Sequence, residues 1–451
     1  MAAPPDPDQP RTVQLAAAIL QHTTSIESYL QQNGLPSPSF APGAPPKLPL
    51  PPNVEQQLAA ALGALDELNA LLLGPMGWLL NQVGHAYDLC SLHALYRYKI
   101  PAQLAVGEEV SVAEIARRCD ADEDAMARLV QHAVTNYLLV RPRPGHVAHS
   151  ATSAMLANVP VLHDFIGNVC EDMWPSAHKV VPALAHTAWP GAAADGATAA
   201  KSGRPPNQTA HNLAEGTDVP FFETLKGDQE RARRFASAMS MLQTMPGFEP
   251  TAALEAYDWG ALGHGATVVD VGGSAGTFAV ALTDKHPDLH VIVQDLPDVI
   301  DKARAELPAR SADRVALQSH DFFTPQPVTS ADAYFFRMIL HDWSDDYCLR
   351  ILRQLISALK PGARVVINDL SIPPPGATTL YEERQVRCKD IAMMAMFNSK
   401  ERTMDEWTGL VAEADPRFRL RSVVQLPASP IGLIEFTWEP EPAPAVAEAA
   451  E

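Results

Sequence analysis

A histidine followed by two acidic residues at wide spacing is the part of the sequence best suited to chemistry. His341 stands in ILHDWSDD after the apolar run AYFFRM, Asp369 follows the run VVIN, and Glu401 lies in NSKERT. A neutral imidazole can take a proton from a hydroxyl group, and a carboxylate can orient the ring and stabilise the imidazolium. A single histidine is often only structural, but these three residues together predict a general base supported by two acids.

A glycine turn and two acids follow three further apolar runs. ATVVDV leads into GGSAGT, which contains Gly272; HVIVQD ends in Asp295; and VALQSHD ends in Asp321, followed by Phe322. Glycines allow a sharp turn and a close approach of the backbone to a ligand, and the following helix presents free N–H groups. An acid after the second strand can accept both ribose hydroxyls, and an acid and a ring after the third can hold adenine. The pattern predicts a site for a cofactor that contains a nucleoside.

Two cofactors fit this pattern, S-adenosylmethionine and NAD. The glycines are spaced G-G-x-x-G, whereas the pyrophosphate-binding turn of dinucleotide folds reads G-x-G-x-x-G. S-adenosylmethionine, which leaves as S-adenosylhomocysteine, is therefore the favoured cofactor. An NAD-dependent oxidoreductase on a Rossmann sheet remains the alternative.

The elements that must position these residues form an α/β fold. From residue 265 onward, apolar β-branched runs alternate with helical stretches, which is typical of a parallel sheet covered by helices on both faces. The last two runs, 418–426 and 431–438, are separated by four residues, too few for a crossover helix, and must form an antiparallel hairpin. We expect a Rossmann-like methyltransferase sheet with a C-terminal antiparallel hairpin over residues 246–438.

The residues before this sheet predict a helical region. Residues 11–33 read as a helix, and the proline-rich stretch 35–53 as an extended strap. The apolar helices 54–73 and 76–98 are broken by Gly74-Pro75, and residues 100–157 read as helix, helix and hairpin, the order of a winged helix. We divide the chain into five parts: 1–53, N-terminal helix and strap; 54–160, helical dimerisation domain with a winged helix; 161–245, helical linker and substrate-pocket region with a loop at 188–219; 246–438, methyltransferase domain; 439–451, disordered acidic tail.

Composition excludes several classes of function. The formal net charge of −19 disfavours nucleic acid as a partner, which argues against a winged-helix regulator, the other alternative. The five cysteines form no C-x-x-C pair, so neither a zinc site nor a disulfide framework is expected. The N-terminus lacks the pattern of a signal peptide, and no run of 18 apolar residues exists, so we expect no membrane span and a soluble, cytoplasmic enzyme.

The segments DVGGSAG, QDLP, HDFF, ILHDWSDD and SKERT, in this order, resemble the plant and fungal class I O-methyltransferases of the caffeic acid and flavonoid type. The proline-rich strap makes the sequence most similar to the fungal aromatic polyketide O-methyltransferases, of which the sterigmatocystin enzyme is an example. The resemblance covers about residues 10–438. It implies a homodimer, a metal-free reaction, and a methyl transfer with His341 as base and Asp369 and Glu401 as its flanking acids.

The resemblance also implies residues that bind the cofactor. They are Gly272, Asp295, Asp321, Phe322 and Arg337, with Trp343 as an indole close to it. The plant enzymes carry Glu at the position of Asp369, and often Gly at Ser274 and Lys at Arg337. None of these departures removes a required group.

The acceptor is expected to be a small aromatic molecule with a phenolic hydroxyl, a polyketide of secondary metabolism. Flexible and polarisable methionines pack well on aromatic faces, and the run DIAMMAMF is rich in them. The predicted pocket residues are Trp174, Met239, Met245, Met393, Met394 and Phe397, each of which could equally be ordinary helix core. The loop 188–219 is either a lid or a tolerated insertion.

Overall fold

The chain folds into two units in the computed structural model, which describes residues 9–185, 205, 207–245, 248–426, 429 and 431–439. One unit, here called the helical unit, comprises residues 1–178, 222–242 and 376–385. The other, the sheet unit, comprises residues 179–221, 243–375 and 386–451. Each unit therefore contains segments from both sides of the domain boundary predicted near residue 245. Beyond Glu439, the predicted tail, 439–451, lies outside the described residues.

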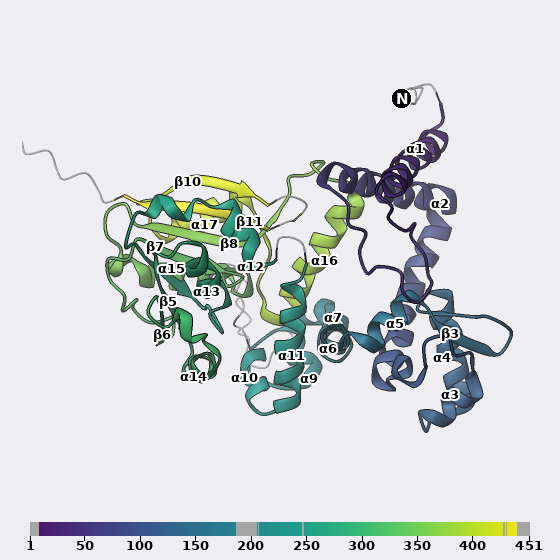
Figure 1. The fold of residues 1–451 in the computed structure, drawn as a ribbon. Coiled ribbons are helices and arrows are strands. Elements are labelled where there is room, and N and C mark those ends of the chain that lie inside the picture. The colour runs from purple at the N-terminus through teal and green to yellow at the C-terminus, as the bar shows by residue number, and fades with distance from the viewer. Residues whose placement is uncertain are drawn as a thin grey trace, which may run out of the picture. The chain divides into compact units, whose positions relative to one another are not determined.

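The main sheet of the sheet unit has the predicted topology (Figure 1). Its strands follow the order β10-β11-β8-β7-β4-β5-β6, and β11 runs antiparallel to both β8 and β10. The strands are β4 (Thr267–Val271), β5 (His290–Asp295), β6 (Val315–Ser319), β7 (Ala333–Arg337), β8 (Arg364–Ile372), β10 (Phe418–Gln425) and β11 (Ile431–Trp438). A short strand, β9 (Arg402–Thr403), pairs in parallel with the end of β8. The Rossmann-like sheet with a C-terminal hairpin is confirmed.

Both faces of this sheet are buried, as the continuous apolar runs predict. Side chains alternate along each strand, so Val268 and Phe335 face one apolar core while Val269 and Phe336 face the other. The first core is completed by α12 (Pro250–Ala256) and α13 (Thr277–Lys285), the second by α15 (Asp345–Leu355) and α17 (Met404–Ala414). A further helix, α14 (Pro297–Glu306), packs against β5 and β6. With both faces covered, the expected ligand site is the carboxyl edge of the parallel strands, where open α/β sheets bind their ligands.

The helical unit begins with two long helices. α1 (Arg11–Gln32) packs against α2 (Pro52–Arg97) through Ile26, Leu30 and Val54. The proline-rich residues between them are not helical, and Leu48 and Leu50 pack against the same core, as expected of a strap. Gly74 has φ 64° and ψ 172° and interrupts α2 where Gly74-Pro75 predicts a break.

A small three-stranded sheet follows, in the order β1-β3-β2. It contains β1 (Val110–Ser111), β2 (Leu139–Val140) and β3 (His146–His149), with α3 (Val112–Arg118) and α4 (Glu123–Thr135) between the first two strands and α5 (Ala151–Asn158) after the third. Ile115, Val130 and Val147 close one buried core with Leu95 of α2. The order helix, helix, hairpin is the predicted one.

The region expected to be a loop at 188–219 contains a helix, which corrects that prediction. α9 (Ala210–Glu215) begins after Thr209, whose hydroxyl accepts the N–H of Asn212 while the Asn212 side chain accepts the N–H of Thr209. This reciprocal cap is a start signal for a helix, but the six-residue helix is too short to show as periodicity. Residues 186–204 lie outside the described residues. The remaining helices are α6 (Pro160–Asn168), α7 (Trp174–His178), α8 (Val180–Ala183), α10 (Phe221–Lys226), α11 (Gln229–Leu242) and α16 (Leu380–Phe397).

Ion pairs join α11 to α6 and to the π-helical turn Val169–Met173 that follows α6. Asp172 is 2% exposed and accepts hydrogen bonds from Arg231 Nε at 2.6 Å and Arg234 at 2.9 Å. Asp164 receives a bidentate pair from Arg233 at 2.8 and 2.9 Å. The buried carboxylate of Asp172 therefore compensates the charges of both Arg231 and Arg234.

Much of α2 carries large apolar side chains on its surface. Leu72 and Met76 are each 70% exposed, and Leu79 and Leu80 more than 60%. Among the described residues, α2 is the one helix long and apolar enough to cross a membrane by length and composition alone. The sequence of α2 does not predict a membrane span, because charged and polar residues interrupt its apolar runs.

Replacing Asp172 with Asn should destabilise the protein by about 3–5 kcal/mol, because breaking a buried ion pair leaves charge without compensation. Urea unfolding of both proteins measures the difference. Glu230→Gln is the matched control: Glu230 pairs with Arg233 at the surface, with its side chain 69% exposed, and its loss should cost less than about 1 kcal/mol. Equal stability of Asp172→Asn and the native protein would contradict the assignment.

Candidate active site

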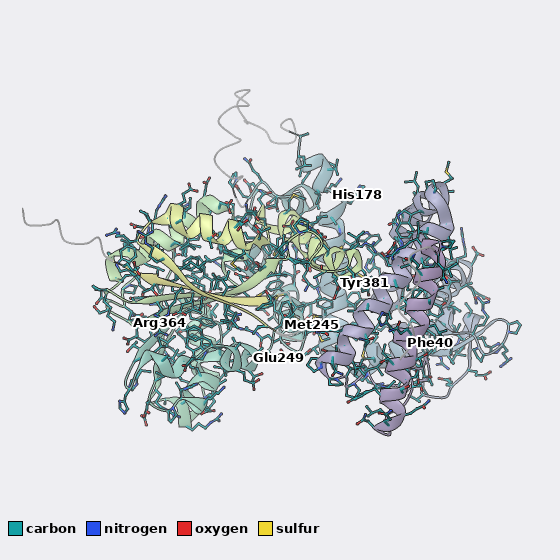
Figure 2. The ribbon with its side chains drawn as sticks, turned by 90° about the horizontal axis from the view of Figure 1, so that it is seen from above. Phe40, His178, Met245, Glu249, Arg364 and Tyr381 are labelled. Atoms are coloured by element: carbon teal, nitrogen blue, oxygen red, sulfur yellow. The ribbon has the colours of Figure 1, made fainter. Side chains whose placement is uncertain are left out.

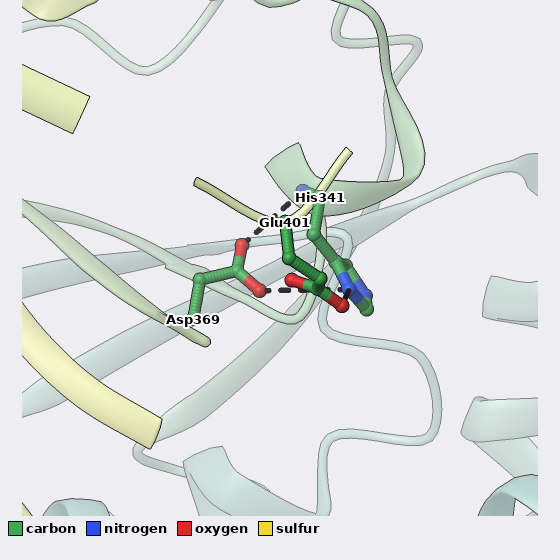
Figure 3. A group of neighbouring side chains, drawn as sticks. All are labelled: His341, Asp369 and Glu401. Carbon is green, nitrogen blue, oxygen red and sulfur yellow. Dashed lines mark hydrogen bonds and ion pairs between the residues drawn. The ribbon is translucent and has the colours of Figure 1, made fainter. Parts of the chain in front are cut away.

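The structure brings His341, Asp369 and Glu401 together (Figure 3). His341 lies in a 3-10 turn, Leu340–Asp342, just after β7, and its side chain is 10% exposed. Its ring Nδ1 lies 3.1 Å from Glu401 Oε1 and 3.8 Å from Asp369 Oδ1. Its backbone N–H donates to Asp369 Oδ2 at 3.3 Å. Because an ionised carboxylate only accepts, Nδ1 carries the proton that binds Glu401, which leaves Nε2 as the basic nitrogen.

Strand pairing positions the two acids. Asp369 was expected at the end of its strand, but β8 continues to Ile372, so Asp369 is an internal residue opposite Gly432 of β11. Glu401 directly precedes β9, which pairs with Ser371 and Ile372 at the end of β8. The two acids, 32 residues apart in sequence, are therefore brought together by β8, which contains Asp369, and by β9, which begins directly after Glu401.

Arg402, which the sequence analysis did not assign, holds the turn that carries His341. This fully buried side chain donates to the backbone carbonyls of Leu340 at 3.1 Å and Trp343 at 2.9 Å, and to Asp345 Oδ1 at 2.8 and 2.9 Å. Its guanidinium lies 4.8 Å from the ring centroid of Trp407. The motif KERT therefore supplies both an acid for the imidazole and the arginine that fixes its turn.

A third acid, Asp342, was also missed. Its Oδ1 lies 3.5 Å from His341 Nε2, the basic nitrogen. Burial raises the pKa of Asp342 to about 6, although His341 opposes this. The only sequence signal is its position directly after the histidine, in ILHDWSDD.

These acids change the basicity of the ring. Burial disfavours the charged imidazole, but interactions with Asp369, Asp342 and Glu401 outweigh it and raise the pKa of His341 to about 10. Burial likewise raises the pKa of Asp369 to about 7, opposed by His341. The site is therefore built to stabilise an imidazolium.

The glycine turn after β4 leaves room only for backbone. Gly272 has φ 75°, and a Cβ there would lie 2.4 Å from Ile339 Cδ1; a Cβ on Gly273 would lie 2.5 Å from Asp270 Oδ2. Asp270 is buried, its Oδ2 has no hydrogen-bond partner among the described residues, and burial raises its pKa to about 7. Asp270 thus offers an unused acceptor beneath the turn.

The predicted acid Asp295 ends β5 beside this turn. Its Oδ2 accepts the N–H of Ser274 at 2.9 Å, and its Oδ1 accepts the N–H of Leu296 at 2.7 Å. Each oxygen keeps a further lone pair for a ligand hydroxyl. Asp321 is exposed two residues beyond β6, and its Oδ1 accepts the N–H of Phe323 at 3.0 Å.

Aromatic rings connect the loop after β6 with the loop after β7. Phe322 and Trp343 lie 5.8 Å apart edge to face, and Phe323 lies 4.8 Å from Trp343. Arg337, at the end of β7, donates to the backbone carbonyl of Phe248. Burial lowers the pKa of Arg337, opposed by Asp270 and Asp369, so its guanidinium lies within the field of both the glycine turn and the histidine site.

The six predicted pocket residues divide between the two units, and their role stays a prediction. Trp174 and Met239 belong to the helical unit. In the sheet unit, Met245, which Figure 2 labels, packs against the core that contains α12 and α13. Phe397 lies edge to face with Phe221 at 5.6 Å. Met393 and Met394 are half-buried in α16.

The sequence is similar to known O-methyltransferases. Residues 197–416 match the family model of the O-methyltransferase domain. The chain is 35% identical to the grayanic acid biosynthesis cluster O-methyltransferase of Cladonia grayi, over 95% of this chain and 88% of that protein. It is 34% identical to the chlorophenol O-methyltransferase of Trichoderma longibrachiatum, over 95% and 90% of the two chains.

Solved structures share the fold. OxaC in complex with sinefungin and meleagrin superposes with a TM-score of 0.72 at 21% identity, covering 94% of this chain and 99% of that one. LepI in complex with SAM gives a TM-score of 0.68 at 24% identity, covering 94% and 100%. Identity of 35% to the Cladonia grayi enzyme, over nearly the full length of both chains, shows that this chain belongs to the O-methyltransferase family.

Proposed function

We propose that the protein transfers a methyl group from S-adenosylmethionine to a phenolic hydroxyl of a small aromatic secondary metabolite, with His341 as general base. The observation that carries the proposal is the His341 ring, bound through Nδ1 to Glu401 at 3.1 Å with Nε2 left as the basic atom. Membership of the O-methyltransferase family removes the support for an NAD-dependent oxidoreductase and for a nucleic-acid-binding regulator.

The residues at the carboxyl edge of the sheet fit S-adenosylmethionine. The buried Oδ2 of Asp270 lacks a partner among the described residues, and a Cβ on Gly273 would lie 2.5 Å from it. Asp270 would accept the ammonium of the methionine part, Asp295 the ribose hydroxyls, and Asp321 the adenine amine beside Phe322. When bound, the cofactor supplies an electrophilic methyl group on a sulfonium.

The chain's own residues would then manage the proton. A phenol titrates near 10, and the pKa of His341 is raised to about 10, so proton transfer from phenol to Nε2 is close to balanced. Glu401, Asp369 and Asp342 stabilise the imidazolium as it forms. The reaction needs the oxygen held in line with the methyl group at near contact distance, which is a task of positioning.

A hydroxyl suits this site better than other acceptors. A neutral amine needs no base, and a carboxylate as the reacting group would be repelled by Glu401 and Asp369. The ligand atoms of His341, Asp369 and Glu401 lie within 4.8 Å of one another, a spacing that a metal ion could also use. We propose a metal-free reaction, because contacts within the protein already orient the ring. Glu401 binds Nδ1, and the backbone N–H of His341 binds Asp369.

The relatives support an aromatic acceptor. One of them is a chlorophenol O-methyltransferase and another belongs to a biosynthesis cluster for grayanic acid. We further propose that the protein works in the cytoplasm as a homodimer, which would cover the exposed apolar side chains of α2.

Replacing Asp295 with Ala should weaken binding of S-adenosylhomocysteine at least about tenfold, because a charge-assisted hydrogen bond contributes roughly 1.5–3 kcal/mol. Calorimetry measures the affinity, and a deoxyribose analogue should show a much smaller loss. Asp298→Ala, an exposed acid on α14, is the control and should bind normally. Tighter binding of NAD than of S-adenosylhomocysteine would refute the cofactor assignment.

Replacing His341 with Ala should lower turnover of a phenol by about 10²- to 10⁴-fold while cofactor affinity is retained. The native enzyme should show kcat/KM rising from pH 7 toward 10, since the raised pKa of His341 keeps the ring protonated at neutral pH. A phenol that is already ionised at pH 8 should lose this rise, because it has no proton to transfer. Near-native activity of His341→Ala would place the base elsewhere, and activity abolished by a chelator would indicate a metal.

Introducing a charge on α2, as in Leu72→Glu with Met76→Glu, should convert the dimer to a monomer at micromolar concentration, as measured by light scattering. Val106→Glu adds one such charge at a side chain outside α2 that is also 70% exposed and should leave the dimer intact. A monomeric native protein would overturn the dimer. Sedimentation of the native protein with phospholipid vesicles would instead assign the exposed face of α2 to a membrane.

A further inference from the structure

One turn of α16 lies directly beside the histidine site. Asp390 Oδ1 accepts the backbone N–H of Glu401 at 3.0 Å, and both residues belong to the sheet unit. Lys389 precedes Asp390 in the same turn, and the carboxylate of Glu401 acts electrostatically on its ammonium. A cation is therefore held close to the acid that orients His341.

The ammonium of Lys389 rests on an aromatic ring. Its Nζ lies 4.8 Å from the ring centroid of Phe248, a favourable contact for a cation. The backbone carbonyl of Phe248 accepts a hydrogen bond from Arg337, at the end of β7. Phe248 thus contacts both Lys389, through its ring, and Arg337, through its carbonyl.

Two other cations near His341 are held by acidic side chains. Arg402 binds Asp345 and the carbonyls of the histidine turn. Lys400 binds Asp345 and Glu406, both at 2.9 Å. Arg337 binds the Phe248 carbonyl, and its Nε has no hydrogen-bond partner among the described residues. Lys389 differs: with the residues for which the structure gives positions, its Nζ forms neither a hydrogen bond nor an ion pair within 4.0 Å.

This state is costly for an ammonium. Burial lowers the pKa of Lys389, opposed only by Glu401, and the aromatic face replaces only part of the lost hydration. Glu401 does not complete the pair: its Oε1 binds the His341 ring, and its Oε2 has no hydrogen-bond partner among the described residues. An anion brought by a ligand would supply the missing partner.

We propose that Lys389 is a specificity-determining residue that binds an anionic oxygen substituent of the acceptor, a carboxylate or an ionised second phenol. The inference rests on the proposed function, since it places the methylated hydroxyl at His341 Nε2 and the anion at Lys389 Nζ. Four carboxylates lie at or beside the site, those of Asp342, Asp369, Glu401 and Asp390, so an anionic acceptor needs a cation that no acidic side chain already binds. A carboxylate is thus not the group that is methylated, but it can bind Lys389 as a second substituent of the acceptor.

The test compares matched acceptors on three variants. The acceptors are a hydroxybenzoate and its carboxamide, and a dihydroxybenzene with an acidic second hydroxyl and its monomethyl ether. Lys389→Met removes the charge and keeps the length, Lys389→Arg keeps the charge, and Lys302→Met removes an exposed charge on α14 as the control. KM and kcat are measured for each, and calorimetry of the same compounds with S-adenosylhomocysteine present gives affinity without turnover.

Lys389→Met should raise KM and weaken binding for the anionic member of one pair by about 10- to 100-fold. The neutral member should change less than about threefold, kcat should be retained, and Lys389→Arg should restore most of the affinity. An effect on the hydroxybenzoate pair identifies a carboxylate, and one on the dihydroxybenzene pair an ionised phenol.

Equal changes for both members of each pair, or a loss in kcat with a shifted pH profile, would overturn the proposal and make Lys389 a positioning residue for Glu401. Calorimetry keeps the two proposals separate: if no phenol is methylated, the proposed function fails, while charge-dependent binding lost in Lys389→Met still supports this inference.

Discussion

A single imidazole surrounded by buried carboxylates is the arrangement on which the proposed chemistry depends. Asp369 is fully buried inside β8, and β8 pairs with β7 on one side and with β11 on the other. Removing an ionised group from water is costly unless a partner compensates it, and His341 is the partner that compensates Asp369. A shift of one residue in the β8 register would turn Asp369 to the opposite face of the sheet. The antiparallel hairpin that closes the sheet therefore also fixes the electrostatics of the site.

The position of the second acid, Glu401, depends on β8, the strand that contains Asp369. Glu401 reaches the ring because β9 pairs with Ser371 and Ile372, just beyond Asp369. Arg402 then holds the turn of His341 from the far side, by its contacts with the carbonyls of Leu340 and Trp343. The histidine, its acids and its clamp thus form one connected set, in which backbone pairing decides the distances.

Sequence patterns predicted the parts of this set that follow from local rules. The alternation of apolar strands and helices located β4 to β8, and the four-residue gap before residue 431 predicted the hairpin. His341 and Asp369 were identified because each follows an apolar run, and Glu401 because it lies in NSKERT. Arg402 was missed because its role arises from contacts across the fold, Asp342 because nothing but its place directly after His341 marks it, and α9 because six residues show no periodicity. Met394 illustrates a further limit: a half-buried methionine on a helix reads the same whether it faces a core or a ligand.

Charge conservation explains why three acids suit a methyl transfer to a neutral hydroxyl. A cationic donor beside His341 would oppose protonation of the ring, whereas the surrounding carboxylates raise its pKa to about 10. A methyl transfer that began from the neutral ring would move the positive charge from the donor to Nε2, because the proton of the hydroxyl would arrive there. The net charge of the site would be unchanged, and Asp342, Asp369 and Glu401 would face a cation before and after the step. The carboxylates therefore need no reorganisation during the reaction, which is the condition under which fixed charges contribute most to catalysis.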